Sequence, residues 1–238
     1  MYREEYPYLY ETHLHSQPVS ACAHVSIRHN LEFYKEKGYA GVFLTDHFVG
    51  SNYKLDGRTL SYEERIRFFF SAFKEGLKIG KEIGLEVFYG FEISHGGTDF
   101  LVYGIDEEWC LAHEDMDKIP KSQLLKQLMA EGALVIQAHP FREAGYIDHI
   151  RLFPRCIQGT EIFNACRTDF ENKLAVQYRE NYDLIPFAGT DNHVGAAIHR
   201  LGGMATDEPI KDEKDFVEKV LSGKAKPFKI DENGFSLL

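Results

Sequence analysis

Short apolar runs along the chain alternate with segments in which apolar residues recur every three or four positions. The runs predict buried strands at residues 8–15, 40–45, 85–92, 100–105, 133–138, 158–163 and 185–190. The periodic segments predict helices at residues 27–37, 61–83, 121–131, 169–181 and 212–221, and residues 48–60 form a predicted polar loop. Ser61 and Glu64 make a capping box at the start of the longest helix. This alternation predicts an α/β fold with a parallel sheet, open or closed into a barrel.

Residue types that bind metals stand at the carboxyl ends of the predicted strands. These ends read ETHLH (residues 11–15), TDH (45–47), GFE (90–92), QAHP (137–140), GTE (159–161) and GTDNH (189–193). Residues i and i+2 of a strand face the same side, so His13 and His15 can aim two imidazoles at one region. Asp191 and His193 can do the same. Imidazole and carboxylate donors suit zinc, manganese or iron, so we expect a metal site at this edge of the sheet.

The amino-acid composition limits which substrates and partners such a site can have. The 238 residues include 27 Lys and Arg against 37 Asp and Glu, which gives a net charge of −10. Because phosphate affinity depends on basic side chains, we expect no binding to long duplex nucleic acid. No run approaches the roughly 18 apolar residues of a membrane span, and residues 1–7 lack the features of a signal peptide. We therefore expect a cytoplasmic protein with one domain over 1–238 and no membrane partner. The sequence does not indicate an oligomeric state.

The order of these motifs resembles that of the PHP (polymerase and histidinol phosphatase) family. The resemblance runs from about residue 9 to residue 195. It rests on HLH (13–15), CAH (22–24), TDH (45–47), GFE (90–92), AHP (138–140) and GTDNH (189–193). It implies a distorted (β/α)7 TIM-like barrel with two to three divalent ions, manganese, zinc or iron, at the carboxyl ends of the strands.

The resemblance also implies which residues hold each ion. The expected ligand sets are His13, His15, Glu92 and Asp191 for the first ion, His24, His47 and His193 for the second, and Glu92, His139 and Asp99 for the third. Many family members have histidine where this chain has Asp99. A carboxylate also binds hard divalent cations, so Asp99 remains a candidate ligand.

Such a centre predicts a metal-dependent phosphoesterase that hydrolyses a small phosphomonoester, or a nucleotide or oligonucleotide phosphate. Metal ions lower the pKa of bound water from about 15.7 to about 7, and a hydroxide bridging two ions would attack the phosphoryl group. Asp46 would orient a histidine ligand, with a loop cap as the alternative role. Arg142, Arg167 and Arg200 follow strand ends and would bind the phosphate, with a surface ion pair as the alternative for each. The segment 161–167 resembles the one that supplies a phosphate-binding arginine in histidinol phosphatases.

Other functions stay open at this point. An amidohydrolase-type barrel also begins with His-x-His and ends with an Asp, although without the x-His that follows Asp191 here. A degenerate PHP-like domain would serve as a non-catalytic module. The four cysteines contain no C-x-x-C pair, and we interpret Cys22 and Cys166 as small residues near the site rather than nucleophiles.

Overall fold

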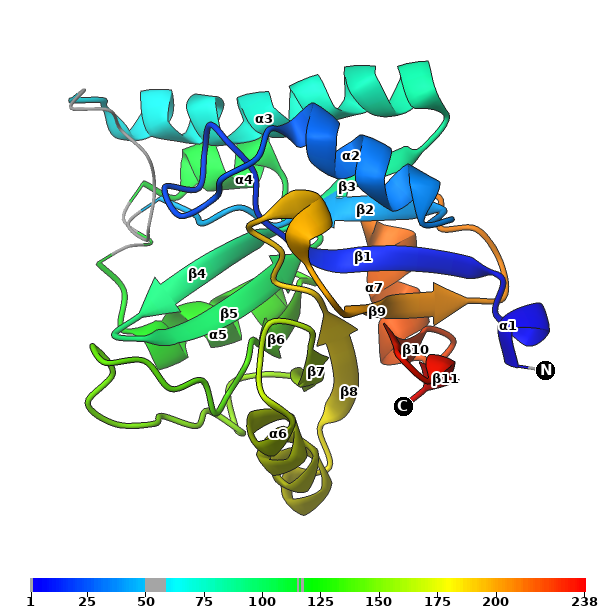
Figure 1. The fold of residues 1–238 in the computed structure, drawn as a ribbon. Coiled ribbons are helices and arrows are strands. Elements are labelled where there is room, and N and C mark those ends of the chain that lie inside the picture. Colours follow the sequence, from blue (N-terminus) through cyan, green and yellow to red (C-terminus); the bar gives the residue numbers. More distant parts are fainter. Residues whose placement is uncertain (1, 50–58, 115, 117) are drawn as a thin grey trace.

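Two mixed β-sheets form the frame of the computed structural model, which describes residues 2–49, 59–114, 116 and 118–238 (Figure 1). The first sheet has the strand order β11-β10-β9-β1-β2-β3 and the second the order β4-β5-β6-β7-β8. The strands of the first sheet are β1 (Tyr8–Leu14), β2 (Gly41–Leu44), β3 (Glu86–Tyr89), β9 (Leu201–Thr206), β10 (Lys226–Asp231) and β11 (Gly234–Leu237). Those of the second are β4 (Phe91–His95), β5 (Thr98–Tyr103), β6 (Leu134–Gln137), β7 (Gly159–Asn164) and β8 (Ile185–Gly189).

Helices connect most of these strands. They are α1 (Tyr2–Glu5), α2 (Ile27–Glu36), α3 (Tyr62–Ile83), α4 (Glu107–Ala112), α5 (Lys121–Ala130), α6 (Asp169–Tyr182), α7 (Glu213–Leu221) and the 3₁₀ turn η1 (Gly195–Ala197). Figure 1 shows α2 and α3 side by side over β2 and β3, and α6 beside β7 and β8. The predicted capping box of Ser61 and Glu64 is present at the start of α3. Among the described helices, none combines the length and apolarity that a membrane span needs.

The inner faces of the two sheets share one aromatic core. Phe216 of α7 is fully buried between them, with its ring centroid 4.2 Å from that of Phe43 on β2 and 5.2 Å from that of Tyr103 on β5. Tyr10 and Phe187 belong to the same cluster. Burial of these rings fixes how the two sheets face each other.

Backbone hydrogen bonds join the two sheets beyond the strand ends. The Asp191 N–H donates to the His13 carbonyl at 2.8 Å, and the Glu92 N–H donates to the Asp46 carbonyl at 3.1 Å. The first bond links β1 to the segment after β8, and the second links the segment after β2 to β4. Residues that lie in or directly after four different strands are thereby held at one place.

The α/β class is confirmed, but the parallel sheet predicted from the sequence is only partly correct. Pairs β1–β2, β2–β3, β6–β7 and β7–β8 are parallel, whereas β4, β5 and β6 pair antiparallel, as do β1, β9, β10 and β11. The described strands therefore pair as two separate sheets, and the closed (β/α)7 barrel is not confirmed. The predicted strand 85–92 is two strands, split at Gly90. The predicted loop 48–60 lies largely outside the described residues.

Gly90 explains this split. A Cβ at this position would lie 2.8 Å from the Tyr103 ring and 2.9 Å from the Val102 carbonyl oxygen. The Gly90 N–H donates to the Leu44 carbonyl, which keeps it in line with β3 and the first sheet. The next residue already pairs with β5. The chain thus passes from one sheet to the other at a residue without a side chain.

Candidate metal centre

β1 places His13 and His15 in the interior of the molecule. Both side chains are fully buried, and their Nε2 atoms lie 3.1 Å apart. The expectation that residues two apart on this strand face one region is confirmed. Asp191 comes to the same region from the end of β8, with its Oδ1 3.5 Å from the His13 Nε2 and 3.4 Å from the His15 Nε2. The predicted pairing of the two ends of the chain therefore holds.

Glu92 of β4 lies at the centre of this group. Its carboxylate is 1% exposed, and neither oxygen has a hydrogen bond of acceptable geometry to the described residues. The nearest histidine nitrogens are 2.8 Å away on His47, 3.3 Å on His13, 3.4 Å on His139 and 3.5 Å on His15. A buried carboxylate with orphaned oxygens costs free energy unless a cation satisfies it.

His139 and Asp99 complete the group on the side of the second sheet. The Nε2 of His139 lies 3.8 Å from the Asp99 Oδ2 and 3.8 Å from the Asp191 Oδ2. His139 and Asp191 also have positive φ angles, of 23° and 58°. Such angles are uncommon away from glycine and cluster at functional sites, so both ligands are held by their surroundings.

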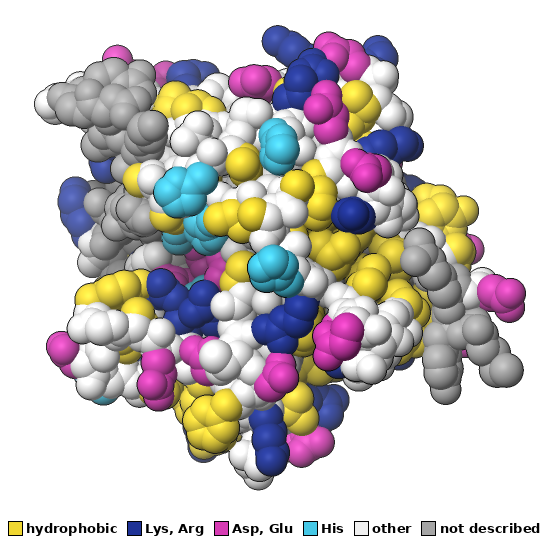
Figure 2. Space-filling view, viewed as in Figure 1, with side chains coloured by type: hydrophobic (Ala, Val, Ile, Leu, Met, Phe, Trp, Pro, Cys, Tyr) yellow, Lys and Arg dark blue, Asp and Glu magenta, His cyan; other side chains and the backbone are white. Residues whose placement is uncertain are grey.

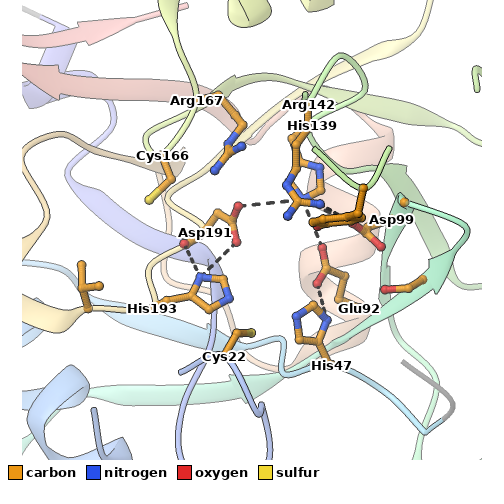
Figure 3. Close-up of a pocket in the computed structure, with 14 residues that line it drawn as sticks. Cys22, His47, Glu92, Asp99, His139, Arg142, Cys166, Arg167, Asp191 and His193 are labelled. Atoms are coloured by element: carbon orange, nitrogen blue, oxygen red, sulfur yellow. Dashed lines mark hydrogen bonds and ion pairs between the residues drawn. The ribbon is translucent and has the colours of Figure 1, made fainter. Parts of the chain in front are cut away.

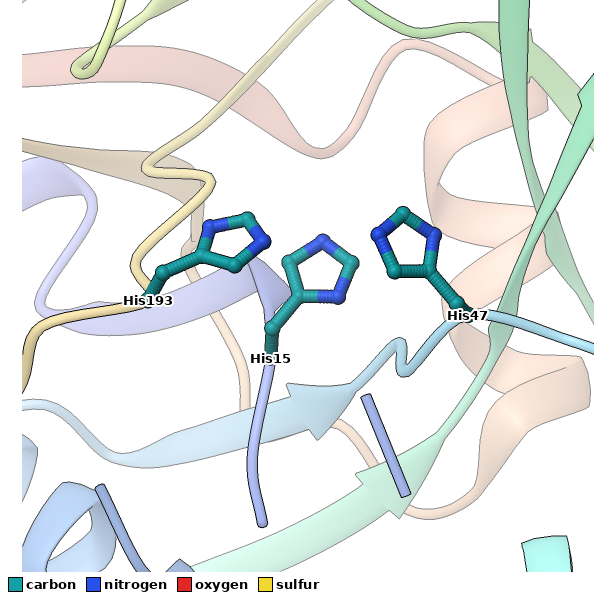
Figure 4. Close-up of side chains that lie close together, drawn as sticks. All are labelled: His15, His47 and His193. Carbon is teal, nitrogen blue, oxygen red and sulfur yellow. The ribbon is translucent and has the colours of Figure 1, made fainter. Parts of the chain in front are cut away.

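Three sets of side chains bring potential ligand atoms within 4.8 Å of one another. They are His13, His15 and Asp191; His13, Glu92 and His139; and His15, His47 and His193. Figure 4 shows the last set, with the His15 ring between the other two. The ring centroids of His15 and His193 are 4.2 Å apart. Of the nine residues expected to bind metal, eight lie together in the structure.

The exception is His24. Its side chain is exposed, although its backbone N–H donates to the His193 carbonyl at 2.9 Å. The segment between His15 and α2 turns so that the backbone of His24 approaches the centre and its imidazole does not. The structure therefore does not bring the His24 side chain to the ligand set for which it was expected.

Asp46 acts through a serine. Its carboxylate accepts hydrogen bonds from the Ser16 N–H and from the Ser16 and Ser20 hydroxyls, at 2.6, 2.8 and 2.6 Å. The Ser20 Oγ in turn lies 3.1 Å from the Nδ1 of His15. The geometry agrees with an orienting role, because Asp46 fixes the hydroxyl that contacts a histidine of the centre.

Two glutamates outside the expected ligand sets contact residues of the centre. Glu161 Oε1 lies 2.8 Å from the Nδ1 of His13, and its Oε2 accepts from the His139 N–H at 2.9 Å. Glu11 Oε1 accepts from the His13 N–H at 2.7 Å and from the Thr190 N–H at 3.0 Å. Glu161 already stood at a strand end in the sequence. Glu11 shares the i, i+2 spacing of His13 and points to the same side of β1.

Charges within the centre perturb the pKa values of its histidines. Burial alone would lower the pKa of His47, but the charge of Glu92 raises it to about 11. Burial is likewise outweighed at His13, where Glu161, Asp191 and Glu92 raise the pKa well above its usual value. The carboxylates therefore keep His13 and His47 protonated, and these protons supply the positive charge that a bound metal ion would otherwise supply.

The remaining groups shift in the opposite direction. Burial, reinforced by the neighbouring His193 and His47, holds the pKa of His15 well below its usual value. Burial would raise the pKa of Glu92 and Asp191, but the histidines around them hold both well below their usual range. Glu92 and Asp191 are therefore ionised at neutral pH, and His15 presents a neutral imidazole.

The centre forms the floor of a cavity of about 770 Å³. Figure 2 shows this hollow, with acidic and histidine side chains inside it and basic side chains at its edge. Arg142 and Arg167 line it opposite His47 and Cys22 (Figure 3). The Nη1 of Arg142 lies 3.8 Å from the Asp99 Oδ2. The Nε of Arg167 is buried and has no hydrogen-bond partner among the described residues.

Arg200 does not line this cavity. Its guanidinium donates to the carbonyls of Ala165 and Arg167 and pairs with Asp169 at 2.6 Å. These bonds hold the segment that carries Arg167 and occupy the donors of Arg200. The expected phosphate-binding role of Arg200 is therefore not supported, and its alternative role as an ion-pair residue is observed.

The donor set fits a divalent metal ion. Imidazole nitrogens and ionised carboxylates converge, and Glu92 is buried at the centre of this group. The cysteines at the cavity differ in chemistry. Burial raises the pKa of Cys166 to about 12, whereas at Cys22 hydrogen bonds to His193 and His47 outweigh burial and lower the pKa to about 6.

Comparison with known proteins agrees with this geometry. No family model and no curated protein matches the chain. A two-domain protein from Bacteroides vulgatus, described as containing a predicted PHP-like metal-dependent phosphoesterase, is similar with a TM-score of 0.67 and 13% identity. The match covers 92% of this chain, which spans only 64% of that protein.

Two further solved structures have the same fold. A protein from Bifidobacterium adolescentis, described as a metal-dependent phosphoesterase, matches with a TM-score of 0.52 and 13% identity over 90% of this chain and 95% of its own. An amidohydrolase from Chromobacterium violaceum matches with a TM-score of 0.55 and 13% identity over 91% and 96%. The resemblance seen in the motifs is thus confirmed at the level of the fold, which is that of the PHP-like metal-dependent phosphoesterases.

Proposed function

We propose that this protein is a metal-dependent phosphoesterase that releases phosphate from a small phosphomonoester. One observation carries the proposal: a buried, ionised Glu92 lies within 2.8–3.5 Å of nitrogens of four histidines, at a cavity whose wall carries two arginines. The floor suits cations and the wall suits an anion. A phosphate ester between them would be bound by both.

The residues that would hold two or three manganese, zinc or iron ions are those that converge. They are His13, His15, His47, Glu92, Asp99, His139, Asp191 and His193. When bound, such ions act as Lewis acids and lower the pKa of a coordinated water to about 7. Glu161 orients His13 through its Nδ1, which leaves the His13 Nε2 free to face the other ligands.

The arginines would bind and orient the substrate phosphate. The buried Nε of Arg167 has an unused hydrogen, and a phosphate oxygen would satisfy it. Arg142 is held near Tyr146, with its guanidinium carbon 5.3 Å from the ring centroid. The cavity volume falls within the range of small-molecule sites, and the net charge of −10 favours a small substrate over duplex nucleic acid.

The test is phosphate release from an aryl phosphomonoester by the purified protein with added manganese. We expect turnover that a chelator removes and that His13→Ala or Asp191→Ala abolishes, with the circular dichroism spectrum unchanged. Full activity in either variant would contradict the assignment of the centre.

A second candidate is an amidohydrolase, because a protein described as one shares the fold. Hydrolysis of an amide or lactone without phosphate release would favour it. Two arginines at the cavity favour the phosphoesterase, because a neutral amide carries no negative charge for them to bind. Failure to bind metal tightly would instead indicate a non-catalytic module.

A further inference from the structure

His47 and His193 need a further partner if they share one ion. His15 lies beside them, but its Nε2 is 3.1 Å from the His13 Nε2 and 3.4 Å from the Asp191 Oδ1. The Nε2 of His15 would therefore bind the ion that His13 and Asp191 would hold. A nitrogen lone pair serves one metal ion, so His15 cannot complete a second set through the same atom.

The other nitrogen of His15 is occupied as well. The Ser20 hydroxyl donates its single hydrogen to Asp46 at 2.6 Å and accepts from the His47 N–H at 3.0 Å. Its remaining lone pair faces the Nδ1 of His15 at 3.1 Å. The Nδ1 of His15 must therefore carry the hydrogen of that bond, which leaves only the Nε2 as a donor to metal.

The thiol of Cys22 occupies the place beside His47 and His193. Its side chain lines the cavity together with those of His47 and His193. Figure 3 shows Cys22 between the two histidines. His24, two residues further along the chain, has an exposed side chain. The turn after β1 thus presents the cysteine, and not the histidine, to the centre.

We propose that Cys22, rather than His24, is the third ligand of the ion held by His47 and His193. On binding, the thiol gives its proton to solvent and the sulfur lone pair forms the bond to the metal. A sulfur ligand favours zinc or iron over manganese at this position. The inference rests on the metal binding that the proposed function requires, and not on the reaction itself.

The test is X-ray absorption at the zinc edge on the full chain loaded with zinc. We expect a sulfur neighbour at about 2.3 Å, distinct from nitrogen and oxygen at about 2.0–2.2 Å. Cys22→Ala and Cys22→Ser should both lose this neighbour. Cys166→Ala is the matched control because Cys166 lines the same cavity, and it should keep the sulfur neighbour, as should His24→Ala.

Zinc affinity gives a second readout. Cys22→Ala should weaken the binding of one zinc equivalent by at least 10- to 100-fold in chelator competition, since loss of an outer partner alone has an effect of about that size. Zinc bound only by nitrogen and oxygen, or a sulfur neighbour lost in Cys166→Ala, would overturn the role of Cys22 and leave the hydrolase proposal standing. A wild-type protein that binds no zinc and no manganese would overturn both.

Discussion

The chemistry of this centre depends partly on residues that form hydrogen bonds with its histidines. Glu161 contacts His13 through one oxygen and the His139 backbone through the other. Both bonds act on histidines that come from different sheets. Carboxylates in this position fix the orientation of an imidazole and increase its basicity, so Glu161 is a positioning residue.

We expect Glu161→Gln to weaken metal binding by about 10- to 100-fold, because the amide retains the size of the side chain but loses its charge. Chelator competition measures this directly. Glu180→Gln, on the exposed face of α6, is the control and should leave the affinity unchanged. Equal affinities in wild type and Glu161→Gln would remove Glu161 from the centre.

Arg167→Ala should raise the KM for a phosphomonoester about 10- to 100-fold with a smaller effect on metal binding. The expected size follows from the roughly 1.5–3 kcal/mol of a hydrogen bond to a charged group. Steady-state kinetics with manganese provide the measurement, and Arg155→Ala, an exposed arginine outside the cavity, is the control. An unchanged KM would mean that the phosphate binds elsewhere.

Residue types and spacing, together with the family resemblance, were sufficient to identify eight side chains that converge in the structure. They were not sufficient for His24 and Cys22, because the path of an irregular turn decides which of two nearby side chains points inward. The roles of Glu161 and Ser20 were not predicted, for a related reason. Their roles depend on contacts with residues far away in sequence, and no local pattern records these.

At the scale of elements, close packing of β8 against β1 sets the positions of the ligands. A Cβ on Gly189 would lie 2.5 Å from the His13 Cβ and 2.8 Å from the Glu161 Oε1. Only glycine allows the end of β8 to approach β1 this closely. Asp191, two residues on, reaches the His13 carbonyl because of that approach.

Gly189→Ala should therefore lower the free energy of unfolding by about 1–3 kcal/mol and displace His13. We expect a lower Tm together with loss of metal binding, measured by thermal unfolding and metal analysis. Gly145→Ala, with no heavy atom near the added Cβ, should change neither. A Gly189→Ala protein with normal metal content would contradict this account of the junction.

Elements with strong local signals were the ones that the sequence predicted well. The capped helix α3 and the apolar strands β1, β6 and β8 appear close to their expected positions. The hairpin of β10 and β11 and the antiparallel placement of β9 beside β1 were not predicted. Strand direction depends on pairing between distant segments, and neither periodicity nor composition reports it.

At the scale of the whole molecule, the centre couples folding to pH. Without metal, the low pKa values of Glu92 and Asp191 stabilise the fold above about pH 4 and cease to do so as pH falls. The raised pKa of His47, about 11, stabilises it fully below about pH 6.5, and this contribution is lost as pH rises toward 11. These three groups together therefore stabilise the metal-free fold most between these limits.

Added metal should counteract the loss of stability at alkaline pH, because it displaces protons from His13 and His47. We expect the increase in Tm caused by zinc or manganese to be larger at pH 8 than at pH 5.5. Thermal unfolding with and without metal at both pH values tests this, and His13→Ala should show little increase at either. An increase in Tm that is the same at both pH values would contradict this distribution of protons in the centre.

The junction of β1 with the segment after β8 also has a consequence for synthesis of the chain. His13 and His15 leave the ribosome early, whereas Asp191 and His193, which complete the ligand set, follow almost 180 residues later. The central strand β1 likewise waits for β9 as its second neighbour. Under the proposed function, metal would therefore be captured with full affinity only after translation, and a bound ion would report that nearly the whole chain has folded.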